Sequence, residues 1–410
     1  MGIKFRLMTV NFLQFFIWGS WLLTIGAFWF GNKEWPATDF GLIFSTMGFA
    51  SLIMPTLAGH LADKFISAQK LYGLLHILGG IGLFFVPMAE TPMQMFWTIL
   101  ITMCCYMPTI PLSNTVGYHI LKINNLDVIK DYPKIRVWGT IGFIAALWTV
   151  SLTHNEQSAN QFFLGGIVAF ILGILAFTLP DCPPHGKEQT EEQGNAWTLL
   201  KSTNFILFFF FSMLLGAALQ LTNAYGDPFL SSFSSDPKFT DTLAVKYPAI
   251  IMSISQISET LFILAIPFFM KRFNIKQVML ISMAAWVLRF GLFIFGDPGS
   301  GLWMIILSCI VYGMAFDFFN VSGSLFIEQN ADKRVRSRAQ GIFTMMVNGV
   351  GAVIGSIGSG YLIGTYFTNP DKSLMWQEIW TSFTIYAGII AVTFAIFFKT
   401  PNTATEKSTI

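Results

Sequence analysis

The stretch IIMSISQISETLFILAIPFF, residues 250–269, decides the fold class because it is apolar over the full thickness of a lipid bilayer. As an α-helix it would be about 30 Å long, which matches the hydrocarbon core of a membrane. Its one formal charge is Glu259, and a charged side chain near the middle of a span costs about 2.5–3.5 kcal/mol in insertion measurements. The sequence therefore predicts a membrane span in which the Glu259 carboxyl group has a function or a partner.

The composition of the whole chain supports this interpretation. Hydrophobic residues make up 54% of the 410 residues and charged residues 11%, whereas an ordinary soluble domain has about 25% charged residues. The net charge of +2 gives no indication of nucleic-acid binding. The four cysteines have no metal-binding spacing, so we expect neither a metal site nor a structural disulfide.

Twelve apolar segments are long enough to cross the bilayer as helices. Their approximate limits are 8–30, 41–62, 70–88, 95–120, 137–153, 161–179, 204–224, 248–270, 277–296, 301–326, 339–363 and 377–398. An even number of spans places both termini on one side of the membrane. The tails and loops on that side carry 19 Lys and Arg residues and the other loops carry 4, so the positive-inside rule predicts cytoplasmic termini.

A polar segment in the middle of the chain separates two sets of six predicted spans. The halves resemble each other weakly: after the second and the eighth span, a short basic loop containing Phe leads into a helix that reaches Gly-Leu-Phe. Internal repeats of this kind are common in transporters. We therefore predict an all-α integral membrane protein with two six-helix bundles. Its parts are an N-terminal bundle (1–180), a cytoplasmic linker (181–203), a C-terminal bundle (204–400) and a cytoplasmic tail (401–410).

Polar and aromatic side chains inside the spans fall on single helix faces, with spacings of three or four residues. By span, they are Gln14 and Trp18; Arg136, Thr140 and Phe143; Gln220 and Asn223; Gln256 and Glu259; and Tyr312, Phe316, Asp317, Asn320 and Ser324. Amides and carboxylates can bind hydroxyl groups and ring edges, and aromatic side chains can stack. A flat, polar, uncharged ligand such as a nucleoside suits this set, and a sugar is the alternative.

Two carboxylates, Glu259 and Asp317, are expected near the centres of their spans, where an ionisable residue indicates a functional site. We expect Glu259 to accept hydrogen bonds from ligand hydroxyls and Asp317 to carry a proton, although the roles could be exchanged. The alternative is an ion pair with Arg136 or Arg289 that only fixes packing. The amides could likewise join helices, and the aromatic residues could be core residues. No Ser-His-Asp, metal or phosphate-loop pattern is present, so we expect no enzymatic activity.

Several longer motifs point to a known family. They are GHLADKFISAQK (59–70), YMPTIPLSNTVGY (106–118), DYPKIRVWGTIGF (131–143), SQISETLFILAIPFFMKRFNIK (255–276) and VYGMAFDFFNVSG (311–323). Together they resemble the nucleoside:proton symporter family within the major facilitator superfamily. In the loop signature of that superfamily, Lys64 here replaces an arginine and Ile66 replaces a glycine.

The resemblance implies proton-coupled nucleoside uptake by alternating access across a bacterial inner membrane. It implies substrate contacts from Arg136, Thr140, Phe143, Gln220, Asn223, Gln256, Glu259, Tyr312, Phe316 and Asp317. The expected partners are a nucleoside, protons and the lipid bilayer, with no nucleic acid and no cofactor beyond the coupling proton, and the chain is expected to be a monomer. The alternatives are a proton-coupled carrier for a sugar or another small polar solute, and an uncoupled facilitator.

Overall fold

The computed structural model describes residues 2–184, 199, 201–332 and 335–399, and these are helical apart from turns, loops and an isolated β-bridge. Within these ranges, eleven helices are long and apolar enough to cross a membrane. The predicted tail (401–410) and most of the predicted linker (181–203) lie outside the described residues.

Two of the predicted spans in the first half of the chain are interrupted in the structure. Its elements are α1 (Ile3–Gly19), α2 (Ile25–Ala27), the π-helical turn η1 (Phe28–Asn32), α3 (Ala37–Lys64), α4 (Ala68–Phe85), α5 (Pro92–Tyr106), α6 (Thr109–Ile123), α7 (Val128–Leu152) and α8 (Asn160–Phe177). The predicted span 8–30 is interrupted at residues 20–24 and is therefore not one of the eleven long helices. The predicted span 95–120 breaks before Pro108, which has no N–H to continue the helix.

The second half contains the longest helix, and its bounds differ from the prediction. The elements are α9 (Thr203–Ser232), α10 (Leu243–Lys246), α11 (Pro248–Arg272), α12 (Ile275–Phe295), α13 (Leu302–Asn330), α14 (Arg336–Met345), the π-helical turn η5 (Met346–Gly351), α15 (Ala352–Tyr366) and α16 (Trp376–Phe397). Helix α9 continues through Pro228 and does not end at 224 as predicted, so Asp227 lies inside a helix. Helix α7 begins at Val128 and not at 137, which places Arg136 in its third turn.

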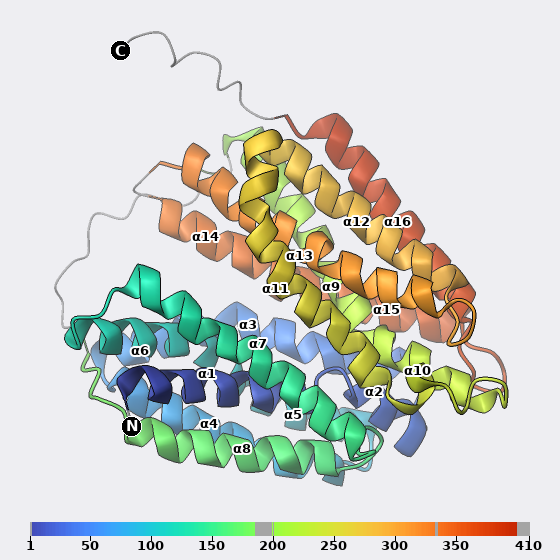
Figure 1. The fold of residues 1–410 in the computed structure, drawn as a ribbon, viewed down its shortest axis with the longest axis horizontal. Coiled ribbons are helices and arrows are strands. Elements are labelled where there is room, and N and C mark those ends of the chain that lie inside the picture. Colours follow the sequence, from blue (N-terminus) through green and yellow to red (C-terminus); the bar gives the residue numbers. More distant parts are fainter. Residues whose placement is uncertain (1, 185–198, 200, 333–334, 400–410) are drawn as a thin grey trace.

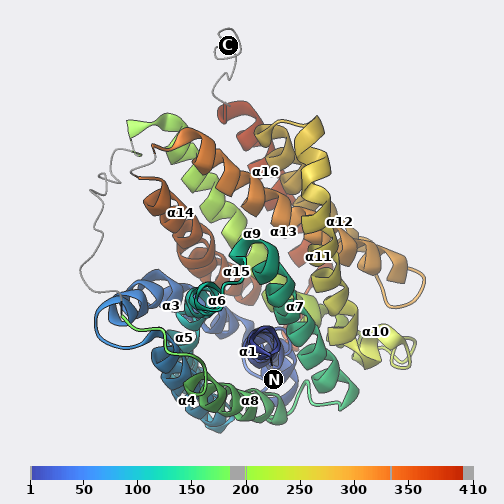
Figure 2. The ribbon, with the colours of Figure 1, turned by 60° about the vertical axis from the view of Figure 1, so that its left-hand side comes forward.

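The helices form two groups, α1–α8 (the first group) and α9–α16 (the second group), which lie one below the other in Figure 1 and are seen from another side in Figure 2. They meet where α3 packs along α15 and where α7 crosses α11. At the first crossing, a Cβ added to Gly41 would lie 2.1 Å from the backbone oxygen of Ser356, and one added to Gly360 would lie 2.8 Å from the Gly41 Cα. Only glycine permits this approach of two backbones.

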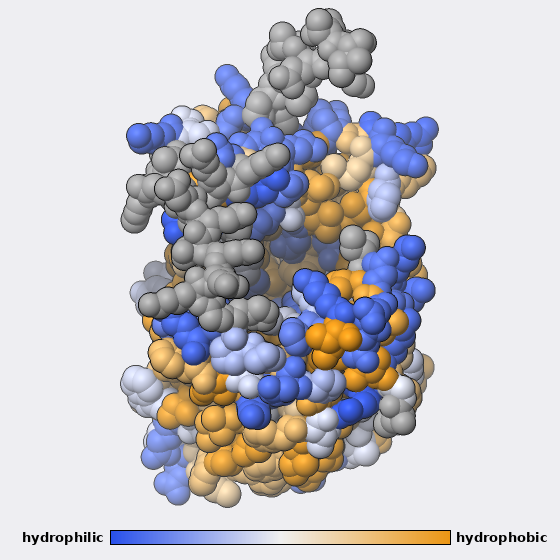
Figure 3. Space-filling model, turned by 90° about the vertical axis from the view of Figure 1, so that its left-hand side faces the viewer, coloured by the Kyte–Doolittle hydropathy of each residue, from blue (hydrophilic) through white to orange (hydrophobic). Residues whose placement is uncertain are grey.

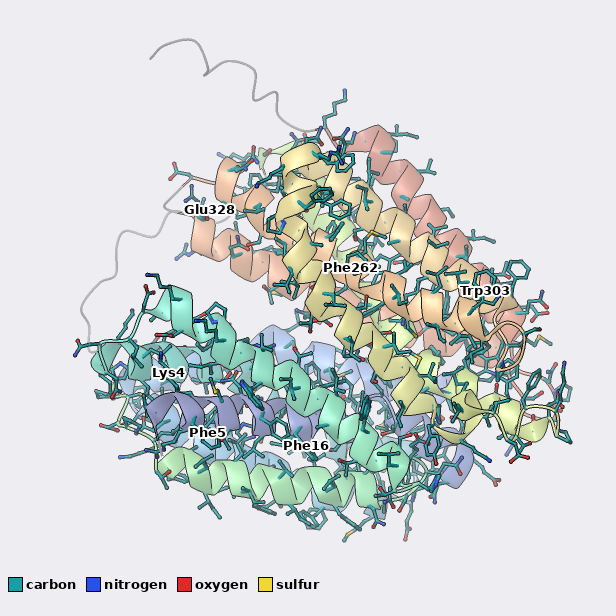
Figure 4. The ribbon with its side chains drawn as sticks, in the orientation of Figure 1. Lys4, Phe5, Phe16, Phe262, Trp303 and Glu328 are labelled. Atoms are coloured by element: carbon teal, nitrogen blue, oxygen red, sulfur yellow. The ribbon has the colours of Figure 1, made fainter. Side chains whose placement is uncertain are left out.

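The groups diverge at one end of the molecule, on the left in Figure 1. This end, called the linker end, carries the N-terminus and residues 65–67 and 178–184. Figure 3 shows a hollow between the groups there. Figure 4 places Lys4 and Glu328 at this end, in different groups. Each pairs within its own group, Lys4 with Asp131 of α7 and Glu328 with Arg336 of α14.

The groups meet at the opposite end, called the far end, which carries residues 33–36, 153–159 and 236–247. Trp148 Nε1 of α7 donates to Ser253 Oγ of α11 over 2.9 Å. The rings of His154 and Tyr247 stack with centroids 5.6 Å apart. The structure is thus closed at the far end and open at the linker end.

Candidate functional site

The predicted site residues come from four helices that line the boundary between the two groups. They are Arg136, Thr140 and Phe143 on α7; Gln220 and Asn223 on α9; Gln256 and Glu259 on α11; and Tyr312, Phe316 and Asp317 on α13. Helix α11 packs on α7 of the first group and on α13 of its own group. A Cβ added to Gly313 would lie 2.7 Å from the Glu259 backbone nitrogen, so this glycine brings α13 directly against the turn that carries Glu259.

Arg136 and Glu259 place opposite charges on the two sides of this boundary. The Arg136 guanidinium lies 4.0 Å from the centroid of the Phe15 ring, a cation–π geometry. Arg136 and Glu259 are within range of electrostatic interaction, but the ion pairs found among the described residues do not include one between them. The two charges therefore attract each other across the boundary without direct contact.

Twelve buried side-chain atoms of the described residues have no hydrogen-bond partner, and four of them belong to predicted site residues or to Trp18. These four are Gln220 Oε1, Gln256 Oε1, Asp317 Oδ2 and Trp18 Nε1, one from each of α9, α11, α13 and α1. Asp317 is 4% exposed, and its charge interacts unfavourably with that of Glu259. More than about 90% of buried polar groups in native proteins are paired. Unpartnered atoms on four helices around one boundary are therefore typical of a ligand site.

Aromatic rings from both groups accompany these polar atoms. In the second group, Tyr312 and Phe316 are parallel, with centroids 6.0 Å apart and an interplanar angle of 6°. In the first group, Trp18 meets Phe143 edge to face, with centroids 6.4 Å apart. The sequence left the role of Trp18 open, and the structure places it against Phe143, with its unpartnered indole N–H among the site atoms.

Arg289, the alternative ion-pair partner for the carboxylates, has a different environment. Its guanidinium is buried and donates to Thr222 Oγ1 (2.6 and 2.9 Å), to the Ser308 carbonyl (2.7 Å) and to Ser255 Oγ (3.4 Å). Its carbon Cζ also lies 4.6 Å from the Tyr312 ring centroid. Arg289 of α12 thus joins α9, α11 and α13.

Gln14 lies in a hydrogen-bond network inside the first group. Its Nε2 donates to Thr109 Oγ1 (2.9 Å), and its Oε1 contacts Tyr72 Oη and His76 Nε2 (both 2.7 Å). The Tyr106 hydroxyl donates to the Gln14 carbonyl oxygen (2.7 Å). Sequence reasoning did not single out His76, although its spacing of four residues from Tyr72 places both on one helix face. This network joins α1, α4, α5 and α6 and engages both the nitrogen and the oxygen of the Gln14 side-chain amide.

The remaining polar residues of α13 are bonded locally. Asn320 Nδ2 donates to the Phe316 carbonyl within the helix (3.0 Å), and Ser324 Oγ accepts from Gln340 Nε2 (3.0 Å). Among the residues that the structure describes, no group of three His, Cys, Asp or Glu side chains is arranged to hold a metal ion. In the same part of the chain, the four cysteines are free thiols.

Two groups of spanning helices, with an opening at one end and carboxylates buried at the boundary between the groups, define a secondary transporter of the major facilitator type. Comparison with known proteins supports this class. A family model described as nucleoside H+ symporter matches residues 1–403. The xanthosine permease of Escherichia coli (strain K12) is 45% identical over 405 residues, covering 97% of this chain and 96% of that protein. The chain belongs to the nucleoside H+ symporter family.

Two further comparisons support the assignment. The nucleoside permease NupG of Escherichia coli (strain K12) is 45% identical over 406 residues, covering 97% of this chain and 96% of that protein. A crystal structure of the nucleoside transporter NupG matches with a TM-score of 0.91 and 44% identity, covering 98% of this chain and 100% of that chain. The predicted family and its transport activity are thereby confirmed, as is a multi-pass protein of the inner membrane. The family consists of transporters and not of enzymes.

Proposed function

We propose that the chain takes up nucleosides together with protons, and that both bind at the boundary between the two helix groups. The observation that carries this proposal is the set of unpartnered buried atoms on α1, α9, α11 and α13. A bound ligand with hydroxyl and amide groups would satisfy them, and each buried polar group left unpaired costs about 1–3 kcal/mol.

The residue types suggest how a nucleoside is held. Gln220, Asn223 and Gln256 supply amides for the base edge and the sugar hydroxyls. Glu259 accepts hydrogen bonds from ribose hydroxyls. The contacts from α7 are Arg136, Thr140 and Phe143, and the base stacks against the aromatic rings of Tyr312 and Phe316 on the opposite side.

The proton binds to Asp317 in this proposal, with Glu259 as the second acceptor. Both carboxyl groups are at the boundary and act on each other electrostatically. A negative charge enclosed between two closing helix groups is expensive, because the low dielectric of the interior disfavours ions. A proton on Asp317 removes that charge, and closure around the loaded site then becomes easier.

The transport cycle follows from the arrangement of the groups. We take α1 to η1 together as a first span, which gives twelve spans and two units, residues 1–180 and 204–400, joined by the linker 181–203. The excess of basic residues on the side of the termini supports a cytoplasmic linker end. The structure is then open to the cytoplasm, and rocking of the two units exposes the site to the other side. One chain contains both units, so we propose a monomer.

The test is uptake of labelled uridine into right-side-out membrane vesicles with an imposed pH gradient, acid outside. The native chain accumulates uridine, and a protonophore abolishes the accumulation. Asp317→Asn loses accumulation but still exchanges uridine across the membrane, because its site stays neutral throughout the cycle. The matched control is Asp236→Asn, since Asp236 is exposed at the far end, and it accumulates normally.

Other outcomes of the same experiment assign a different function. Undiminished gradient-driven accumulation by Asp317→Asn removes Asp317 from the proton role. Uptake by the native chain that only equilibrates, with no response to the protonophore, identifies a facilitator. Competition by sugars as strong as competition by nucleosides identifies a sugar carrier.

A further inference from the structure

A second pair of carboxyl groups, one buried and one half-buried, lies at the far end of the molecule, outside the site described above. Asp227 on α9 belongs to the second group, and Glu156, in the turn between α7 and α8, belongs to the first. Asp227 is 1% exposed, and neither of its carboxyl oxygens has a hydrogen-bond partner. The two carboxyl groups are within range of electrostatic interaction. An acidic group from each half of the chain thus meets where the halves close.

Glu156 is held at this place by the second group. The backbone N–H of Ala249, at the start of α11, donates to Glu156 Oε1 over 3.4 Å. The N-terminus of a helix favours a negative charge, so Glu156 is the member of the pair that is better placed to stay ionised. Asp227 is enclosed by the neighbouring helices. The next residue in the chain, Pro228, packs directly against Gly26 of α2.

Three lysines at the far end are engaged elsewhere. Lys33 donates to the carbonyl oxygens of Pro87 (3.2 Å) and Ala89 (2.8 Å). Lys246 pairs with Asp241 at 2.8 Å, and Lys238 lies over the Phe239 ring.

The remaining titratable neighbour of the pair is His154, which stacks on Tyr247 and acts on Glu156 electrostatically. None of these contacts brings a positive charge onto the Asp227 carboxyl group.

When two carboxylates interact and one of them is buried, ionising both is costly, and the pair takes up a proton. Burial also raises the pKa of Glu156, so the proton can be shared between the two groups although Glu156 is the better placed to be ionised. When the helix groups separate at the far end, water reaches both side chains and this restriction disappears. Closure and proton uptake are therefore linked at this point of the fold.

We propose that Asp227 and Glu156 form a second proton-binding site, which holds one shared proton while the far end is closed and releases it when the far end opens. The site is separate from Asp317 and Glu259, and it acts on the conformational equilibrium whether or not a nucleoside is bound. Acidity on the far side of the membrane then favours closure behind the substrate.

The experiment measures how fast a buried reporter cysteine reacts with a maleimide in the purified protein without nucleoside. The reporter is Ser253→Cys, because Ser253 is 1% exposed and bonded to Trp148 across the closure. The four native cysteines are replaced, and Ser234→Cys, exposed in the structure, serves as a reference for the pH dependence of the thiol reaction itself.

The reaction rate of the Ser253→Cys reporter is divided by that of the Ser234→Cys reference at each pH. This ratio is expected to fall as the pH is lowered from about 8 to about 5. The change is at most about tenfold per pH unit, the limit for an equilibrium that takes up one proton. Asp227→Asn and, separately, Glu156→Gln remove the repulsion, so both variants react slowly at every pH. Asp236→Asn keeps the native slope.

The proposal is overturned if the native protein shows no slope or if a folded variant of either residue keeps it. Glu156→Gln decides the question should Asp227→Asn fail to fold. The readout needs neither a pH gradient nor uridine. A flat result here leaves the coupled uptake intact, and a failure of coupled uptake leaves the reporter slope unchanged.

Discussion

Two polar regions inside the membrane part of this protein contain similar residues but differ in how those residues are bonded. Around Gln14 in the first group, the amide nitrogen and oxygen of the side chain are both bonded to the surrounding helices. At the boundary between the groups, Gln220, Gln256 and Asp317 each keep a buried oxygen without a partner. The comparison teaches that the state of the hydrogen bonds, and not the residue type, distinguishes a joint between helices from the candidate site at the boundary.

Two arginines in the spanning helices, Arg289 and Arg136, also differ in how fully they are bonded to the protein. Arg289 donates to three neighbouring helices and is fully buried. Arg136 stacks on Phe15 and faces Glu259 from the other group without an ion pair in the described residues. The first arginine stabilises one group, whereas the second presents its charge to the boundary.

The largest expected effect comes from replacing an unpartnered amide by an apolar side chain. Gln256→Leu removes a hydrogen bond to the nucleoside but none to the protein, so kcat/KM for uridine uptake falls about 10–100-fold. Thermal unfolding of the purified protein stays unchanged or improves, because the unpaired buried oxygen is gone. A lowered unfolding temperature with normal uptake would show that Gln256 joins helices.

The corresponding substitution at Gln14 is expected to lower stability and to leave uridine affinity unchanged. Gln14→Leu leaves Tyr72, His76 and Thr109 without their partner and lowers the free energy of unfolding by about 1–3 kcal/mol. Uridine affinity of the folded fraction remains close to native. Denaturation of the purified protein and a binding isotherm at low temperature separate the two quantities. A weakened affinity at native stability would place Gln14 in the ligand site.

Lysine at the two arginine positions sharpens the same distinction. Lysine keeps the positive charge but loses the planar fork of donors. Arg136→Lys raises KM for uridine about tenfold and leaves stability unchanged, while Arg289→Lys lowers stability by about 1–2 kcal/mol. Uptake kinetics and thermal unfolding of both variants decide the assignment, and the reverse pattern would contradict it.

The smallest effect concerns a bonded carboxylate at the edge of the molecule. Gln69 Nε2 donates to Asp181 Oδ1 over 2.5 Å, and this bond holds the pKa of Asp181 below its usual value. Because the folded-state pKa is the lower one, the stabilisation is present above the unfolded pKa and is lost as the pH falls through the folded pKa. Asp181→Asn is expected to lower the unfolding temperature slightly near pH 7.

The difference between this variant and the native protein should shrink below about pH 4. Asp236→Asn is the control, because Asp236 is exposed and lies at the far end, away from Gln69. A difference that stays constant over this range would exclude the ionised Asp181 as its source.

The sequence alone predicts the spans well where a long apolar run has clear ends. Helix α11 begins at Pro248, as predicted, and α12 begins with the capping box of Asn274 and Gln277. The prediction is wrong at the end of α9, where Gly226, Asp227 and Pro228 look like a turn. Proline removes a single hydrogen bond of a helix, and neighbouring helices in a membrane protein compensate for it.

The site was predictable only in part, for a related reason. Helical spacing indicated which face of α11 and α13 carries polar groups, and a charge inside a span indicated Glu259 and Asp317. Spacing could not separate Gln14 from Gln256, because the partners that bond the Gln14 side chain are 58 to 95 residues away in the chain. It also missed Asp227 and Glu156, which come from different halves of the chain and interact electrostatically in this structure.

The close crossing of α3 and α15 bears on the rate at which the two helix groups can move against each other. Around Gly41 and Gly360, two helices touch through bare backbone, so no side-chain ridge of one is locked into a groove of the other. Two helices that touch in this way can rotate relative to each other with little change in contact energy. We therefore expect a larger residue at Gly41 or Gly360 to slow turnover, although neither glycine is among the candidate site residues.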